Sequence, residues 1–151
     1  MRRRCFLLLI SPLFLYLYLI AAIYGYDAYI NYQRKYYFTD EDRLERITGV
    51  RFPDMDVVVS RKGNTAFMGD YNDEVVVEFE DSLSDAFYLS LDSIIKTERT
   101  SWVKNGSTYI FNQTWGNGMP APKGESEDED RTFSISFAKG SKRATIYSGM
   151  W

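Results

Sequence analysis

Carboxylate side chains are the groups in this chain best placed for chemistry. Asp70, Asn72, Asp73 and Glu74 lie close together, and paired carboxylates can serve as the acid and base of a glycoside hydrolase. The same residues belong to a segment rich in turn formers, where Asp and Asn side chains commonly bond backbone amides. We therefore interpret them as turn residues and keep a carboxylate-based hydrolase as a minor alternative.

A second acidic group, residues 125–130, reads Glu-Ser-Glu-Asp-Glu-Asp. Oxygen ligands of this kind suit Ca²⁺, but the mid-loop glycine and the distal glutamate of an EF-hand loop are missing. The run therefore predicts a solvated acidic loop rather than a metal site.

The irregular segment before this run carries the residues that we single out for partner binding. Residues 115–124 form a long stretch without a helix or strand pattern, and such loops are often functional. Trp115, Asn117 and Met119 are predicted to form an exposed contact for a partner. The alternative is a flexible loop whose Trp115 folds back onto the core.

The composition excludes most familiar catalysis. The chain has no histidine, which removes His-based acid–base catalysis and His metal ligands. A single cysteine, Cys5, removes intramolecular disulfides and Cys-cluster metal sites. No nucleophile, phosphate-loop or dinucleotide motif is present. The sequence therefore favours a non-enzymatic protein that needs no cofactor.

Residues 1–26 predict a membrane anchor. Three arginines at residues 2–4 precede an uncharged, mainly apolar run over residues 5–26, and about 20 such residues cross a bilayer as a helix. We expect this run to bind the lipid bilayer as a retained signal anchor, because a cleaved signal has a shorter apolar run. Cleavage near Ala22, followed by secretion, is the alternative.

The cations around the apolar run predict its orientation. The N-terminal arginines outweigh Arg34 and Lys35 on the other side, which favours a cytoplasmic N-terminus. The expected location is the inner (plasma) membrane, single-pass, with the C-terminal domain outside the cytoplasm. Residues 27–38 keep helical spacing and carry several tyrosines, so they predict a juxtamembrane aromatic helix extension at the membrane–water interface.

Residues 39–151 predict an extracytoplasmic α+β domain. A short helix over residues 39–49 has Thr39 as its expected N-cap and Gly49 at its end. The main helix begins at Ser82 or Ser84 and buries one apolar stripe.

Strand patterns cover residues 56–61, 65–69 and 74–80 before the main helix, and two hairpins cover residues 102–111 and 131–151 after it. Asn105-Gly106 predicts a type I′ turn in the first hairpin. Strands joined by short turns favour antiparallel pairing. We therefore expect a mostly antiparallel sheet of about six to seven strands packed by one main helix.

The charge divides unevenly along the chain. Residues 1–35 hold five Lys or Arg and one Asp, a net +4, whereas residues 36–151 hold thirteen Lys or Arg and twenty Asp or Glu, a net −7. An acidic domain is a poor nucleic-acid binder, because phosphate neutralisation needs clustered cations. The partners we expect are another envelope protein or a basic protein, and an immunity or inhibitor protein that neutralises a basic toxin is the alternative function.

Several short segments of the domain resemble a family of small bacterial envelope proteins. They are Ile-Thr-Gly-Val-Arg-Phe-Pro at residues 47–53, Gly69-Asp70-Tyr71, Glu78-Phe79 and Gly140-Ser141-Lys142. Members of this uncharacterised family carry one N-terminal anchor or lipoprotein signal and a compact α+β domain. The resemblance implies architecture and envelope location, and it implies no activity.

Overall fold

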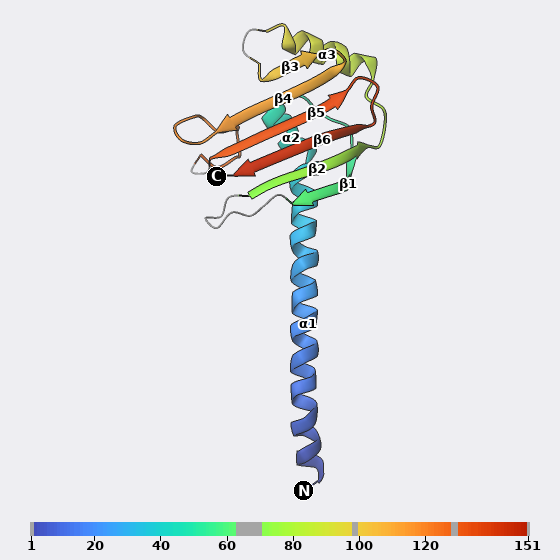
Figure 1. Ribbon diagram of the computed structural model, residues 1–151, viewed down its shortest axis with the longest axis vertical. Coiled ribbons are helices and arrows are strands. Elements are labelled where there is room, and N and C mark those ends of the chain that lie inside the picture. The colour runs from blue at the N-terminus through green and yellow to red at the C-terminus, as the bar shows by residue number, and fades with distance from the viewer. Residues whose placement is uncertain (1, 63–70, 98–99, 128–129, 151) are drawn as a thin grey trace. The chain divides into compact units, whose positions relative to one another are not determined.

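The computed structural model describes residues 2–62, 71–97, 100–127 and 130–150 of the chain (Figure 1). The chain divides into two compact units, Met1–Tyr36 and Tyr37–Trp151. The strand expected at residues 65–69 lies outside the described residues.

The first unit is a single helix, since helix α1 (Arg2–Thr39) runs through all its described residues. Within the described part of the chain, one helix is long and apolar enough to span a membrane. This is the 28-residue segment Pro12–Thr39, with a mean hydropathy of 1.5 and an apolar window that is 0% buried. The helix continues without a break through residues 27–38, the expected aromatic extension.

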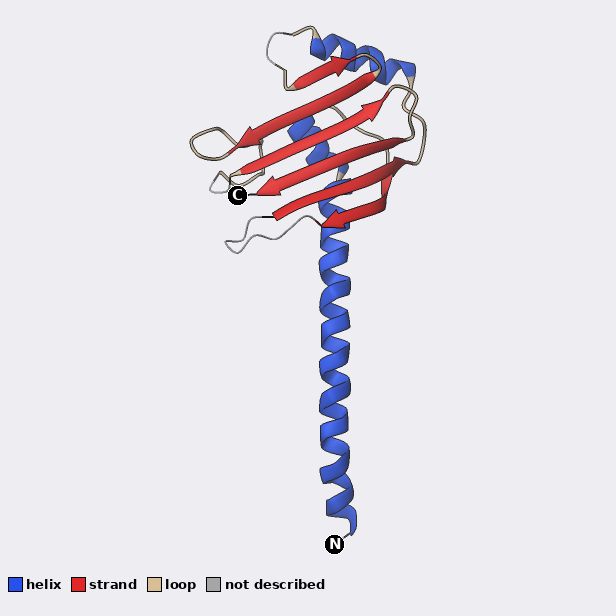
Figure 2. Cartoon of the chain, in the orientation of Figure 1, coloured by secondary structure: helices blue, strands red, loops and turns tan. Residues whose placement is uncertain are grey.

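The second unit is built on one six-stranded antiparallel sheet in the order β1-β2-β6-β5-β4-β3 (Figure 2). Its strands are β1 (Met55–Lys62), β2 (Tyr71–Phe79), β3 (Trp102–Asn105), β4 (Thr108–Trp115), β5 (Arg131–Ala138) and β6 (Arg143–Met150). The expected α+β class and antiparallel sheet are therefore confirmed.

Among the described residues, one face of this sheet is covered by the core and the helices. Alternate residues along the strands are buried, as Val75, Val77 and Phe79 are on β2, because side chains alternate between faces of a strand. Helix α2 (Glu41–Thr48) lies behind the strands in Figure 2, and α3 (Asp85–Ile95) packs the same core near β3. The ring of Phe137 is central to this core, with centroids of five other rings 5.7–6.3 Å away: Phe52, Phe79, Phe87, Trp102 and Tyr109.

The helix caps follow the sequence signals with one correction. Asp40, not Thr39, is the N-cap of α2, because its carboxylate accepts the backbone N–H of Arg43 at 3.1 Å. Gly49 ends α2 in the left-handed conformation (φ 72°), as expected. Ser84 caps α3 by accepting the backbone N–H of Phe87.

The type I′ turn predicted at Asn105-Gly106 is wrong. Asn105 pairs with Thr108 across β3 and β4, so the two-residue turn is Gly106-Ser107, with a positive φ of 61° at Gly106. A positive φ at the first central residue is the pattern of a type II′ turn. The type I′ pattern occurs instead at Asn117-Gly118, where φ is 49° and 86°.

Candidate functional site

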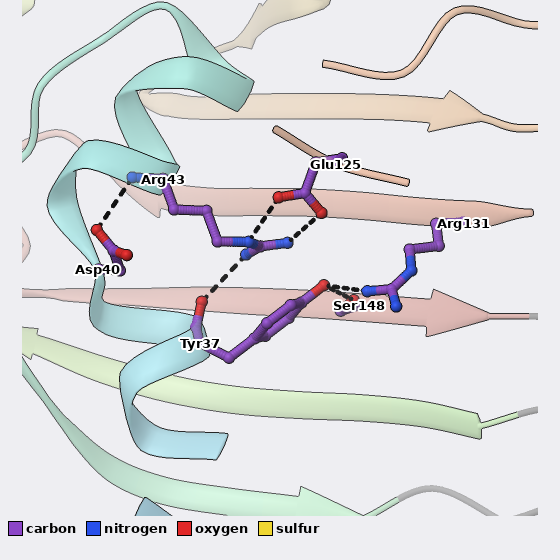
Figure 3. A network of polar contacts seen from close by, with 6 residues as sticks. All are labelled: Tyr37, Asp40, Arg43, Glu125, Arg131 and Ser148. Atoms are coloured by element: carbon purple, nitrogen blue, oxygen red, sulfur yellow. Dashed lines mark hydrogen bonds and ion pairs between the residues drawn. The ribbon is translucent and has the colours of Figure 1, made fainter. Parts of the chain in front are cut away.

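A buried polar network lies where α2 meets the loop of residues 116–127 (Figure 3). Arg43 donates from Nε to Glu125 Oε1 at 2.8 Å and from Nη2 to Glu125 Oε2 at 2.9 Å. Its third nitrogen, Nη1, donates to the carbonyl of Tyr37 at 3.0 Å. The side chains of Arg43 and Glu125 are only 7% and 8% exposed, so this is a buried, two-pronged ion pair.

Local sequence places Arg43 in this position. The N-cap at Asp40 sets the start of α2, and the inward side of the helix then consists of Arg43, Leu44, Ile47 and Thr48. These residues recur at helical spacing. Leu44 and Ile47 pack in the core. Because Arg43 is on the same side of the helix, its guanidinium lies against the inner face of the sheet.

Tyr37 lies between two guanidinium groups. Its ring centroid is 3.6 Å from Cζ of Arg43 and 5.9 Å from Cζ of Arg131, distances at which a cation is attracted to an aromatic face. Its hydroxyl accepts a bond from Arg131 Nη1 at 2.8 Å and lies 3.3 Å from Ser148 Oγ. The network therefore joins the last turn of α1, which carries Tyr37, to α2, the loop, β5 and β6.

This network holds the fold in place and offers no reacting group. Arg43 cannot lose its proton in a protein, and both Glu125 oxygens are already held by its N–H groups. Ser148 contacts the hydroxyl of Tyr37 and has no basic partner among these residues. The arrangement can fix the 116–127 loop against α2, but it lacks a nucleophile with an adjacent base.

Glu125 corrects the expectation of a solvated acidic loop. The first carboxylate of the run is buried in the ion pair with Arg43, whereas Glu127 is exposed. Residues 128–129 lie outside the described residues. Within the part of the chain that the structure describes, no group of three or more Cys, Asp or Glu side chains could hold a metal ion.

The residues singled out for partner binding separate into two kinds. Trp115 is fully buried at the end of β4, as expected if it folds back onto the core, and its indole N–H has no hydrogen-bond partner. Asn117 is exposed, and Met119 is 47% exposed. Backbone bonds between Gly116 and Met119 close the turn that presents them. Partner binding by this turn stays a prediction.

The two described carboxylates near residue 72, Asp73 and Glu74, are neighbours on one strand and do not form an acid–base pair. Asn72, Asp73 and Glu74 lie in strand β2 rather than in the expected turn, and Asp70 lies outside the described residues. Asn72 accepts a hydrogen bond from Tyr147 at 2.7 Å, and Glu74 pairs with Arg61 at 3.5 Å. The expectation of a turn was therefore wrong, because the strand begins at Tyr71.

A second ionic cluster lies between α3 and the β3–β4 hairpin. Lys104 Nζ is 2.8 Å from Asp92 Oδ1, to which the hydroxyl of Tyr109 also donates at 3.0 Å. The Lys104 hydrogen bond, aided by that of Tyr109, holds the pKa of Asp92 below its ordinary value. The same bond from Asp92 raises the pKa of Lys104. Because each group stabilises the charged form of the other, neither is poised to act as an acid or base.

Sequence reasoning missed the Arg43–Glu125 pair, although one signal was available. Arg43 occupies the inward side of an amphipathic helix, and a buried arginine requires a partner. Nothing local identifies that partner, because Glu125 lies 82 residues further along the chain.

Comparison with protein-family models, with curated proteins and with solved structures finds no match to this chain. The resemblance to small bacterial envelope proteins therefore stays a prediction.

Proposed function

We propose that this protein is a single-pass membrane-anchored binding module with its α+β domain outside the cytoplasm. The observation that carries the proposal is the apolar segment Pro12–Thr39, whose most apolar window is 0% buried by the rest of the chain. Exposed apolar surface of this extent is costly in water and is stabilised in a bilayer.

Three features support a retained anchor with a cytoplasmic N-terminus. The apolar run over residues 5–26 is longer than that of a cleaved signal, and α1 continues past Ala22 without a break. The arginines at residues 2–4 favour the cytoplasmic side. Tyr24, Tyr26 and Tyr29 are exposed on the helix, where interfacial tyrosines are satisfied by an apolar ring and a wet hydroxyl.

The anchor is tested by fractionation and protease digestion of spheroplasts that carry the full chain. We expect the protein in the membrane fraction after an alkaline carbonate wash, with the domain digested before lysis. Release into the soluble fraction would favour cleavage near Ala22. Protection of the domain until lysis would reverse the proposed orientation.

Binding, rather than catalysis, is favoured because the charged groups of both described clusters are paired with each other. Arg43 and Glu125 satisfy each other, as do Lys104 and Asp92, so neither described cluster leaves an activated group. The exposed turn at Asn117 and Met119 is the contact surface that we propose for an envelope partner. Backbone bonds between Gly116 and Met119 close this turn, and the Arg43–Glu125 pair holds the same loop further along the chain.

A photo-crosslinking residue in place of Met119, in the full chain in cells, tests this contact. The matched control replaces Leu89, which is 71% exposed on α3. We expect a partner crosslinked at position 119 and not at position 89. Equal products at both positions would contradict a specific contact.

An inhibitor of a basic toxin is the second candidate, and the domain's net charge of −7 favours it. Two carboxylates lie close together near α2, where the hydrogen bond that protonated Glu41 donates to Asp54 raises the pKa of Glu41. A contact made by exposed carboxylates weakens strongly with salt, whereas one centred on Met119 does not. Comparing position-119 crosslinking at low and high salt therefore separates the two candidates.

A further inference from the structure

One row of uncharged side chains crosses the whole sheet on the face opposite the core. The strand registers align six residues in this row: Val59, Val76, Thr145, Ser136, Ile110 and Val103. The two ends of the row are the most exposed, at 42% for Val59 and 59% for Val103. Figure 1 views the domain from this side, with α2 behind the strands.

The rest of this outer face is hydroxyl-rich. On β4 and β5 its outward side chains are those of Thr108, Ile110, Asn112, Thr114, Thr132, Ser134, Ser136 and Ala138. None of these is charged, and the hydroxyls of Thr114 and Thr132 are 3.0 Å apart. Hydroxyl groups both donate and accept hydrogen bonds, so such a face is complementary to an identical face.

Most charged residues of the outer face form ion pairs with one another. Arg143 pairs with Glu78 at 2.8 Å, and Arg61 pairs with Glu74 at 3.5 Å, both toward the β1 side of the sheet. With Asp56, which the register places opposite Glu78, the face carries two cations and three carboxylates, a net −1, in a domain whose net charge is −7. Two copies of this domain repel each other at most approaches, and on this face, which holds little of the domain's negative charge, they meet with less repulsion. A basic partner, in contrast, would favour the acidic surface elsewhere.

The area of the face also fits a pair of identical domains. Strands about 4.8 Å apart and residues rising about 3.3 Å each make the six-stranded face roughly 600 Å². Two such faces in contact bury about 1,200 Å², the lower end of a specific protein–protein interface. Anchoring both copies in one membrane raises their effective concentration, so an interface of this size suffices.

We propose that the outer face of the sheet is a homodimer interface, in which two copies pack sheet against sheet about a two-fold axis. In such an interface the same patch faces itself, and residues at its centre approach their own copies. Ser136 lies in the middle of the uncharged row, so it is closest to the axis. The inference is independent of the contact proposed at Met119.

Crosslinking of single cysteines in the full chain tests the interface. In a Cys5→Ser background, Ser136→Cys is compared with Leu89→Cys in native membranes. A bis-maleimide spanning about 10 Å is used, because packed sheets lie about 10 Å apart, beyond the reach of a direct disulfide. We expect a product of twice the chain's mass for Ser136→Cys and none for Leu89→Cys.

Three outcomes would overturn the proposal. Equal dimer formation at both positions would indicate random collision. A Ser136→Cys product of another mass would mean that a different protein covers the face. No product would mean that the face is solvated.

A second measurement uses Ser136→Arg, which places two like charges at the axis. With the full chain reconstituted in lipid vesicles, we expect Ser136→Arg to abolish energy transfer between copies labelled at the C-terminus, while its circular dichroism spectrum stays that of the folded protein. Leu89→Arg is the control and should remain dimeric. A Ser136→Arg protein that remains a folded dimer would also refute the proposed interface.

Discussion

Two ion pairs in this domain have the same length but different surroundings. The Arg43–Glu125 and Lys104–Asp92 pairs each have a nitrogen–oxygen distance of 2.8 Å. The side chains of the first pair are 7% and 8% exposed, and those of the second are both 35% exposed. Burial removes water from the first pair, so each of its charges depends on the other. Distance alone therefore does not tell which pair the fold requires.

The largest expected effect comes from removing one partner of the buried pair. Arg43→Ala leaves the Glu125 carboxylate and the Tyr37 carbonyl without their donor, and we expect unfolding to become easier by about 3–5 kcal/mol. Urea unfolding of the full chain in detergent measures this loss.

The matched control is the double variant Arg43→Met with Glu125→Met, which removes both charges and keeps the volume. We expect its stability to lie within about 1 kcal/mol of the parent, or above it, because no unpaired charge remains buried. A double variant as unstable as Arg43→Ala would show that packing, not charge, explains the loss.

The next effect concerns the hydroxyl of Tyr37. Tyr37→Phe keeps the ring under Arg43 but removes the acceptor of the Arg131 bond and the contact with Ser148. We expect a loss of about 1–2 kcal/mol in the free energy of unfolding. Ser148→Ala, measured alongside, should cost less, since it leaves the Arg131 bond intact. A larger loss for Ser148→Ala than for Tyr37→Phe would show that the Ser148 contact contributes more to stability than the Arg131 hydrogen bond.

The exposed pair should produce a small dependence of stability on acid pH. The pKa of Asp92 is lowered from its ordinary value of 3.8, so its stabilisation is present above about pH 4 and is lost as the pH falls through the lower folded pKa. Asp92→Asn should remove this part of the acid titration of stability. If the stability of that variant fell with acid pH as steeply as that of the parent, Asp92 would not be the group responsible.

The smallest effect is expected for Lys104→Met, whose partner remains accessible to water. We expect a smaller loss than for either variant of the network, and one that disappears in about 0.5 M salt because exposed charges are screened. The Arg43→Ala loss should persist in the same salt. If both losses depended equally on salt, the two ion pairs would not differ in their exposure to solvent screening.

Local pattern was sufficient for much of the fold. The alternation of Val75, Val77 and Phe79 predicted a half-buried strand, because this signal acts within a few residues. The start of α3 was predicted at Ser82 or Ser84, and Ser84 is its N-cap. Asn-Gly was a weaker guide, since it occurs twice and the strand register decided which copy adopts the type I′ pattern.

The candidate site was less predictable than the fold. The exposure of Asn117 and Met119 matches the loop composition, whereas the burial of Trp115 and Glu125 depends on what packs against them. Acidic neighbours at residues 127–130 favour a solvated carboxylate at position 125. They carry no information about an arginine on α2.

The sequence by itself determined the apolar helix, the amphipathic elements and the α+β class, because periodicity and caps are properties of neighbouring residues. Only the tertiary structure decided that Glu125 is buried, that Tyr37 lies between Arg43 and Arg131, and that one uncharged row crosses all six strands. These features join segments up to 111 residues apart, as Tyr37 and Ser148 are. Burial and pairing at such separations follow from packing of the whole domain, which no local pattern encodes.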